Sequence, residues 1–291
     1  MPKLKTTGGA TDAYTSPTVS IGMPVYNGAK YIREALDSLL AQTFVDFELI
    51  ISDNASTDST PDICREYVGL DARIRYVRQH ENLGAAENFK FVLSEAKGAC
   101  FMWAAHDDEW MEDYLTEAML LLSDASTNFI FPTFLLKSIR LGFKKEMSEE
   151  IFRFVEATDR KERVLQFLNL HHYSCKCNIV YSLFKREFLI NATMRQDISN
   201  DGVLGAVILG LGGGKILHHT RFSKRYPWYW PGMLKDLHYC FHKKGEKTFA
   251  LAKVGALIRL KALFPEYSGE ISSIFDSYHR YKYYKHYRIR R

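Results

Sequence analysis

The sequence predicts an α/β protein in which a mostly parallel central sheet lies between helices. The first observation behind this prediction is an alternation of short β-rich runs with segments whose apolar residues recur at helical spacing. The second is that each β-rich run ends in polar residues, as strands do at the carboxyl edge of a parallel sheet. With 291 residues, the chain can bury a large core as one large domain or two small ones.

The elements of this alternation are expected in the first part of the chain. Four short runs rich in β-branched and apolar residues are expected to be strands: Thr18–Pro24, Phe47–Ser52, Ile74–Arg78 and Ala99–Ala104. One helix is expected at Lys30–Gln42, where apolar side chains share a face, and another after the polar stretch DNASTDST. A third is expected to open at Asn82–Gly84 and to stop at Gly98.

Two adjacent carboxylates, Asp107 and Asp108, follow the fourth expected strand in the stretch FMWAAHDDEW. Carboxylates at the edge of a sheet are good oxygen ligands for Mg²⁺ or Mn²⁺, and such a metal can neutralise the phosphates of a nucleotide. The alternative is structural, with Asp107 capping the next helix and Asp108 solvated.

The polar ends of the other strands are expected to converge with these carboxylates on one crevice. Asp53 accepts hydrogen bonds there, so it suits a base with an N–H on its pairing edge, which uracil, thymine and guanine have. Its alternative role is to cap the following helix. The glycine patterns of dinucleotide-binding folds and of P-loops are absent from the sequence, which removes the main signal for those two classes.

Four segments carry a resemblance to a known family by their order and spacing. They are PVYNGAKYIREALDSLLAQTF, FELIISDNASTD, ENLGAAENF and MWAAHDDEW. The chain resembles the family 2 glycosyltransferases of the GT-A fold, strongly over residues 18–115 and more weakly to about residue 230. The resemblance implies an inverting transfer from a nucleotide-activated sugar, usually UDP-linked, with a divalent metal, Mn²⁺ or Mg²⁺, as cofactor.

The resemblance also implies roles for residues at matching positions. Those of the nucleotide-sugar site are Pro24, Tyr26, Asn27, Asp53, Asn82, Gly84, Asp107 and Asp108. The first three would form a loop beside the nucleotide, Asp53 would pair with uracil, and the next two would border the nucleoside. Asp107 and Asp108 match the end of the family's DxD-type motif, in which Ala105 stands in place of the first Asp. Asp107 is the favoured metal ligand, with Asp108 beside the sugar or as a second ligand.

Inversion at a sugar carbon needs a general base on the face opposite the leaving diphosphate. The family supplies this base from an acidic residue that precedes a helix in the second half of the domain. In the stretch MRQDISNDGVLGAVILGLGG, Asp201 is the expected base and Asp197 the second candidate. Either residue could instead cap the helix.

The second half of the chain gives weaker patterns. Residues 125–175 are expected to hold mixed helical segments, notably Arg160–Leu170, and the resemblance implies that this region shapes the acceptor pocket. CKCNIVYSLF is expected to be a core strand with its lead-in. Thr220–Gly232 is expected to be a loop that either closes over pyrophosphate with its cations or rests on the surface by its aromatic residues.

These patterns divide the chain into three expected parts. Residues 1–17 would be a flexible lead-in, residues 18–232 a glycosyltransferase domain, and residues 233–291 a helical extension. Within the domain, residues 18–115 would bind the nucleotide sugar, and residues 116–232 would bind the acceptor and supply the base.

Composition and charge indicate the cellular compartment expected for the protein. Five cysteines do not indicate a disulfide framework, residues 1–17 lack the apolar core of a signal peptide, and no apolar run is long enough to span a bilayer, so a cytoplasmic protein is expected. The net charge of +5 comes from residues 278–291, which contain six Lys or Arg and five Tyr. This tail would contact the inner membrane surface or form a solvated helix; nucleic-acid binding ranks well behind.

The predicted function is transfer of a sugar from a nucleotide sugar, foremost a UDP-sugar, to a hydroxyl of a carbohydrate or glycolipid acceptor. The setting would be synthesis of a cell-surface polysaccharide or glycolipid. Two alternatives stay open. One is a nucleotidyltransferase, which also uses strand-end carboxylates and a metal, and the other is a binding module that keeps the nucleotide-sugar site without its chemistry.

Overall fold

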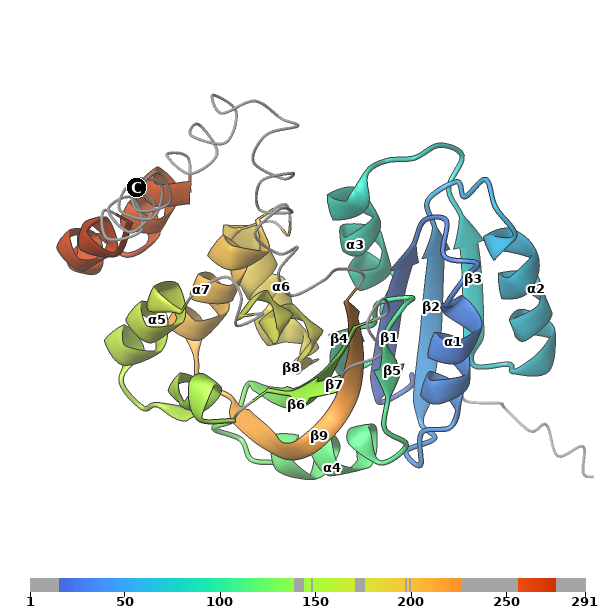
Figure 1. Ribbon diagram of the computed structural model, residues 1–291, viewed down its shortest axis with the longest axis horizontal. Helices are drawn as coiled ribbons and strands as arrows, with labels where there is room; N and C mark the ends of the chain where they lie inside the picture. Colours follow the sequence, from blue (N-terminus) through green and yellow to red (C-terminus); the bar gives the residue numbers. More distant parts are fainter. Residues whose placement is uncertain are drawn as a thin grey trace, which may run out of the picture.

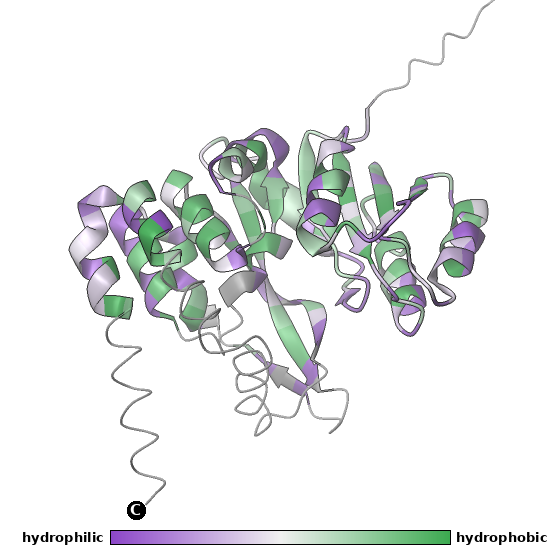
Figure 2. Ribbon diagram, turned by 90° about the horizontal axis from the view of Figure 1, so that it is seen from above, coloured by the Kyte–Doolittle hydropathy of each residue, from purple (hydrophilic) through white to green (hydrophobic). Residues whose placement is uncertain are grey.

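The computed structural model describes residues 16–138, 144–147, 149–170, 176–196, 198, 200–226 and 256–275. Its centre is one mixed sheet with the strand order β3-β2-β1-β4-β8-β6-β9-β5, to which β7 is added as a partner of β6 (Figure 1). Helices flank this sheet, which confirms the predicted α/β class. The central strands are mostly hydrophobic, whereas the helices around them alternate hydrophobic and hydrophilic residues (Figure 2).

The first part of the sheet is parallel throughout. Its strands are β1 (Val19–Val25), β2 (Phe47–Asp53), β3 (Ile74–Arg78) and β4 (Cys100–Trp103), and its helices are α1 (Ile32–Leu40), α2 (Thr60–Leu70) and α3 (Ala85–Ser94). All seven residues of β1 are buried, because this strand lies between two others and under helices. A Cβ on Gly22 would lie 2.7 Å from Cγ2 of Val92, so α3 packs directly on the backbone of β1. The four expected strands are therefore confirmed.

The second part of the sheet is mixed. Its strands are β5 (Glu109–Trp110), β6 (Phe129–Ser138), β7 (Lys144–Glu146), β8 (Leu183–Lys185) and β9 (Lys215–Tyr226). β8 pairs antiparallel with both β4 and β6, β9 runs parallel to β6, and β5 pairs antiparallel with β9. The long β9 curls around this end of the molecule (Figure 1). The predicted parallel pairing therefore holds throughout the first four strands and again between β6 and β9, whereas the other pairs of the second part are antiparallel.

Three expectations for the second half are wrong in part. Residues 125–175 contain the ten-residue strand β6 before the expected helix, which is α5 (Arg160–Asn169). The strand was missed because FIFPTFLL is a continuous apolar run without alternation, as is usual for a strand covered on both faces. CKCNIVYSLF forms the 3₁₀ helix η3 (Lys176–Tyr181), and only its end belongs to a strand. Residues 220–226 of the expected loop lie in β9, and residues 227–232 fall outside the described part of the chain.

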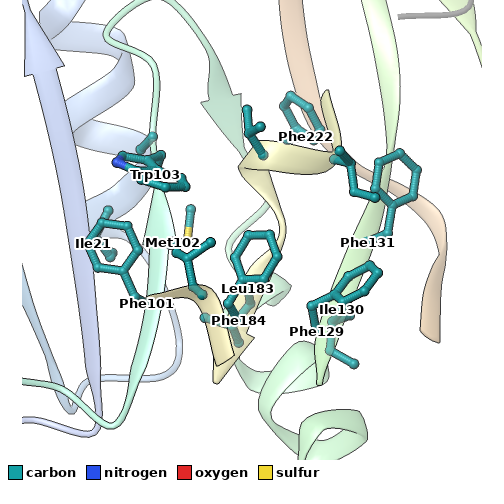
Figure 3. Close-up of a cluster of buried hydrophobic side chains, with 14 of the residues drawn as sticks. Ile21, Phe101, Met102, Trp103, Phe129, Ile130, Phe131, Leu183, Phe184 and Phe222 are labelled. Atoms are coloured by element: carbon teal, nitrogen blue, oxygen red, sulfur yellow. The ribbon is translucent and has the colours of Figure 1, made fainter. Parts of the chain in front are cut away.

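Aromatic side chains join the two parts of the sheet into one core. Phe101 and Trp103 of β4 lie in the same cluster as rings from β8, β6 and β9 (Figure 3). The ring of Phe222 stacks on Trp110 at 4.6 Å between centroids and lies 5.3 Å from Phe134. The short strand β5 is thereby fixed beside β9, which places the residues before it against the second part of the sheet.

The remaining helices surround the second part of the sheet, with α4 (Tyr114–Leu122) against β6 and β9 and α6 (Arg186–Arg195) against β8. The others are η1 (Glu149–Glu156), α7 (Asp201–Leu211) and, in the C-terminal extension, two helical stretches at 256–263 and 268–275 joined by η4 (Pro265–Tyr267). The extension packs on α5 and α7, where Arg160 pairs with Glu266 at 2.6 Å and a Cβ on Gly210 would meet the ring of Phe264. In the described residues, no helix combines the length and apolarity that a membrane crossing requires. Residues 1–15 and the tail 278–291 lie outside the described residues.

Candidate active site

The loops after β1 and β2 are tied together by hydrogen bonds. The backbone N–H of Asn27 donates to Oγ of Ser56 at 2.9 Å, and Oδ1 of Asn27 accepts from the N–H of Thr57 at 2.8 Å. The N–H of Gly28 donates to Oγ1 of Thr60 at 2.8 Å. The predicted convergence of these two strand ends is therefore present, with Pro24 buried in β1 beside Ser52 and Tyr26 44% exposed.

Both loops hold a non-glycine residue in the left-handed region. The φ angle is +52° at Asn27 and +60° at Ala55. Asn adopts this conformation more readily than most residues, but Ala does so at a cost in conformational energy. Such strain persists where the surrounding hydrogen bonds fix the backbone, and it is common at ligand sites.

Asp53 is fully buried at the end of β2. Its Oδ1 accepts from the N–H of Ser56 at 2.8 Å, and its Oδ2 accepts from the hydroxyl of Tyr76 at 2.8 Å, with Nε of Arg78 at 3.6 Å. A carboxylate has about four acceptor directions, so these two bonds leave capacity for another donor. The expected alternative, a cap on the following helix, is wrong, because Asp58 accepts from the N–H of Thr60 where α2 begins.

Asn54 holds the loop that contains Asn82 and Gly84. Its Nδ2 donates to Oδ1 of Asn82 at 2.9 Å and to the carbonyl of Gly84 at 3.2 Å, while its Oδ1 accepts from the N–H of Leu83 at 2.8 Å. Gly84 has a φ of +84°, which favours glycine. The two predicted residues are thus brought to the end of β2 by Asn54, a buried residue that sequence reasoning did not assign.

The residues after β4 complete this edge of the sheet. A Cβ on Gly28 would lie 2.7 Å from Cδ2 of His106, so the imidazole packs against the loop after β1. Burial lowers the pKa of His106, against the opposing influence of the carboxylates of Asp107 and Asp58. Asp107 is half-buried and, among the described residues, has no hydrogen bond or ion pair. It does not cap a helix, because the next one, α4, begins after Asp113.

Asp108 is in a different environment from its neighbour. Its side chain is fully buried, its Oδ2 lies 3.0 Å from Nζ of Lys224, and its Oδ1 accepts from the N–H of Arg225 at 3.1 Å. Burial raises the pKa of the Asp108 carboxyl to about 6, although Lys224 acts in the opposite direction. The alternative of a solvated Asp108 is therefore wrong, and the two adjacent acids have separate surroundings.

The three cations of the loop expected at Thr220–Gly232 lie in β9, where ion pairs and a ring contact hold them. The ammonium of Lys224 lies 4.5 Å from the ring centre of Tyr181, and Arg221 pairs with Asp113. The guanidinium of Arg225 pairs with Glu109 of β5 and with Glu34 of α1. These pairs join the two parts of the sheet by charge, so the segment up to residue 226 is not a free loop.

Asp201 begins α7 and is exposed. The cap of this helix is Asn200, whose Oδ1 accepts from the N–H of Val203 at 3.0 Å, so Asp201 does not have the capping role. Burial raises the pKa of the Tyr181 phenol, and the carboxylates of Asp108, Asp107 and Asp201 raise it further. Asp201 and the two acids after β4 therefore lie within electrostatic reach of one tyrosine. Asp197 lies outside the described residues.

The sequence placed Asn54 among the polar residues at the strand ends without giving it a role of its own, and it did not identify Tyr181. Asn54 directly follows Asp53 at the end of a strand, where side chains point to the site. For Tyr181 the sequence holds no signal, because only the folded chain brings η3 beside β9.

Comparison with known proteins identifies similar sequences among the glycosyltransferases. The model of the family described as glycosyl transferase family 2 matches residues 20–188. A protein of Bacillus subtilis named for teichuronic acid biosynthesis, the glycosyltransferase TuaG, is 36% identical over 115 residues, which are 40% of this chain and 46% of that protein. The glycosyltransferase EpsH of Bacillus subtilis is 35% identical over 116 residues, 40% of this chain and 33% of that protein. The matches thus span less than half the length of these relatives.

Solved structures show the same fold at low sequence identity. S. aureus TarS 1–349 has a TM-score of 0.56 and 18% identity, covering 72% of this chain and 60% of TarS 1–349. The mannosyltransferase PcManGT from Pyrobaculum calidifontis, in complex with GDP-Man and Mn²⁺, has a TM-score of 0.55 and 17% identity, covering 91% of this chain and 75% of PcManGT. The fold is GT-A, as the sequence predicted. The family model matches more than half of the residues of this chain, and the chain therefore belongs to glycosyl transferase family 2.

Proposed function

We propose that this protein transfers a sugar from a nucleotide sugar, with UDP as the nucleotide, to a hydroxyl of a carbohydrate or glycolipid acceptor. The observation that carries the proposal is the convergence of Asp53, the loop at Asn82 and Asp107, which has no partner among the described residues, at one edge of the sheet in a member of this family. Solved structures with this fold hold UDP-GlcNAc or GDP-Man with Mn²⁺. The name of TuaG supports a role in cell-surface polysaccharide or glycolipid synthesis.

The nucleotide would lie along the ends of β1 and β2. Asp53 would accept the N–H of the uracil ring with its remaining acceptor capacity, which selects against cytosine and adenine. Pro24, Tyr26 and Asn27 would form the wall after β1, where Tyr26 offers an exposed ring. Asn82 and Gly84 would border the nucleoside in the position that Asn54 gives their loop.

A divalent metal fits this site through Asp107. The carboxylate is a hard oxygen ligand without a protein partner among the described residues, whereas both oxygens of Asp108 already accept hydrogen bonds. Within the described ranges no three His, Cys, Asp or Glu side chains gather to hold a metal by themselves. Mg²⁺ and Mn²⁺ are commonly held by one or two carboxylates together with substrate phosphates, and the bound ion would neutralise charge on the diphosphate.

Asp201 would act as the general base. Its exposed carboxylate would take the proton of the acceptor hydroxyl while the hydroxyl oxygen forms a bond to the anomeric carbon. The bond from that carbon to the diphosphate oxygen breaks with its electron pair on the diphosphate, so UDP leaves and the configuration inverts. Asp197 is the second candidate for this role.

The expected organisation of the chain is part of the proposal. Residues 18–115 would bind the donor, residues 116–232 would bind the acceptor and supply the base, and residues 233–291 would be a helical extension. The basic and aromatic tail 278–291 would add contact with an anionic membrane surface beside a cytoplasmic enzyme.

The test combines ligand binding and product analysis. We expect one UDP-sugar, from a panel of UDP-, GDP-, dTDP- and CMP-sugars, to raise the melting temperature with Mn²⁺ and to lose most of this effect in EDTA or in Asp107→Ala. Turnover should release UDP. Release of pyrophosphate would instead indicate nucleotidyl transfer, and binding without turnover in the presence of acceptors would indicate a module without chemistry.

A further inference from the structure

Lys224 is a cation that the fold holds at the edge of the site. Its side chain is 19% exposed, and its ammonium lies 3.0 Å from Oδ2 of Asp108 and 4.5 Å from the centre of the Tyr181 ring. An ammonium group carries three N–H donors. Among the described residues only Asp108 accepts a hydrogen bond from it, so its other donors remain for a ligand.

Asp108 fixes this cation in place. The carboxylate is fully buried, and its second oxygen accepts from the backbone N–H of Arg225, the residue after Lys224 in β9. One acid thus holds both the backbone and the ammonium of the same strand segment. A cation that is already fixed at a site needs little reorganisation when an anionic ligand binds, so the free-energy cost of binding is lower.

The ammonium lies within electrostatic reach of the carboxylate that would hold the metal. Asp107 directly precedes Asp108 in the chain, and it contributes with Tyr181 and Asp108 to raising the pKa of Lys224 despite burial. The ligand that suits this place is an anion, because it would meet a partly desolvated cation with unused donors. A diphosphate is the anion of the proposed substrate.

We propose that Lys224 binds the diphosphate of the nucleotide-sugar donor and stabilises the leaving UDP, with Asp108 positioning the ammonium instead of serving as a metal ligand. This inference rests on the proposed function. When the sugar–oxygen bond breaks, its electron pair stays on the diphosphate oxygen, and Lys224 stabilises the added charge by hydrogen bonds without transferring a proton. The site would then have two sources of positive charge, the metal at Asp107 and the ammonium at Lys224.

The test compares UDP with uridine, which lacks the diphosphate. We expect Lys224→Met to weaken UDP binding by roughly 10- to 100-fold in calorimetry, the usual loss for one charge-assisted hydrogen bond, and to leave uridine binding unchanged. Arg221→Met is the matched control, because it removes a cation from the same strand that pairs with Asp113. In EDTA the wild-type protein should still bind UDP more tightly than uridine, whereas Lys224→Met should bind the two with similar affinity.

A second variant separates binding from folding. Lys224→Met alone leaves Asp108 buried without its partner, whereas Lys224→Met with Asp108→Asn leaves no unpaired charge. UDP affinity in this double variant equal to that of the wild type would overturn the inference and leave the proposed function standing. Wild-type protein that binds neither UDP nor any UDP-sugar would overturn the proposed function and this inference with it.

Discussion

The two parts of the sheet hold their site residues by different means. At the ends of β1 and β2, hydrogen bonds between loops predominate: Asn27 and Ser56 are 29 residues apart in the sequence, and Asn54 and Asn82 are 28 apart. Around β5 and β9, ion pairs predominate; Glu109 and Lys137 are 28 residues apart, but other pairs join more distant residues. Lys224 and Asp108 are 116 residues apart.

This difference separates binding from chemistry in the proposed enzyme. The first part would present a fixed surface to the nucleoside, because hydrogen bonds between its loops hold them in place. The second part would supply charges for the step in which charge moves, because its carboxylates and cations face one another across strands. Changes in the second part should therefore alter turnover and stability most, with Lys224 as the exception that would also contact the donor, and changes in the first part should alter donor affinity.

The largest effect is expected from Asp201→Asn. Loss of a general base should lower the rate of UDP release by roughly 10²- to 10⁴-fold with acceptor present, while the affinity for UDP stays unchanged. The fold should persist, because Asn200 and not Asp201 caps α7. Glu187→Gln is the matched control, since it removes an exposed acid from the first turn of the neighbouring helix α6. Unchanged turnover in Asp201→Asn would transfer the role of base to Asp197.

The next largest effect is expected from Asp108→Ala. This change leaves the Lys224 ammonium without its counter-charge and removes the acceptor of the Arg225 N–H. We therefore expect a loss of about 3–5 kcal/mol in the free energy of unfolding. Asp113→Ala breaks the ion pair with Arg221. Because the Asp113 side chain is 47% exposed, this change should cost about 1 kcal/mol or less. Urea unfolding of both variants measures the contrast. Equal losses in the free energy of unfolding would show that the buried pair at Asp108 stabilises the fold no more than the exposed pair at Asp113.

The same contrast explains what could be predicted from the sequence. Strands β1 to β4 and the polar residues after them were predicted because their pattern is local, and the structure brings Asn27, Asp53 and Asn82 together as expected. β6 was missed because a fully buried strand lacks alternation. The pairing of Asp108 with Lys224 could not be predicted, because no local pattern records which residue of a distant strand lies opposite.

A smaller effect, this time in the first part, is expected from Asn54→Ala. The side chain makes three part-buried hydrogen bonds to the loop at residues 82–84, so their loss should cost roughly 2–3 kcal/mol. The affinity for UDP should fall because the loop loses its position, while the rate at saturating donor should change little. Asn191→Ala on the exposed surface of α6 serves as the control. A lower rate at saturating donor with intact affinity would contradict the division of roles.

The smallest effect is expected from two alanine substitutions that test how tightly the first part is packed. A Cβ at residue 28 would meet Cγ2 of Val25 at 2.6 Å and Cδ2 of His106 at 2.7 Å, so Gly28→Ala should cost about 1–2 kcal/mol and displace the imidazole from the loop after β1. At Gly69 nothing lies within 4 Å, so Gly69→Ala in α2 should stabilise the protein by about 0.5–1 kcal/mol. Thermal unfolding measures both changes, and His106 proton resonances report the displacement. Equal effects at the two glycines would show that the loop after β1 adapts to its ligand instead of being fixed before binding.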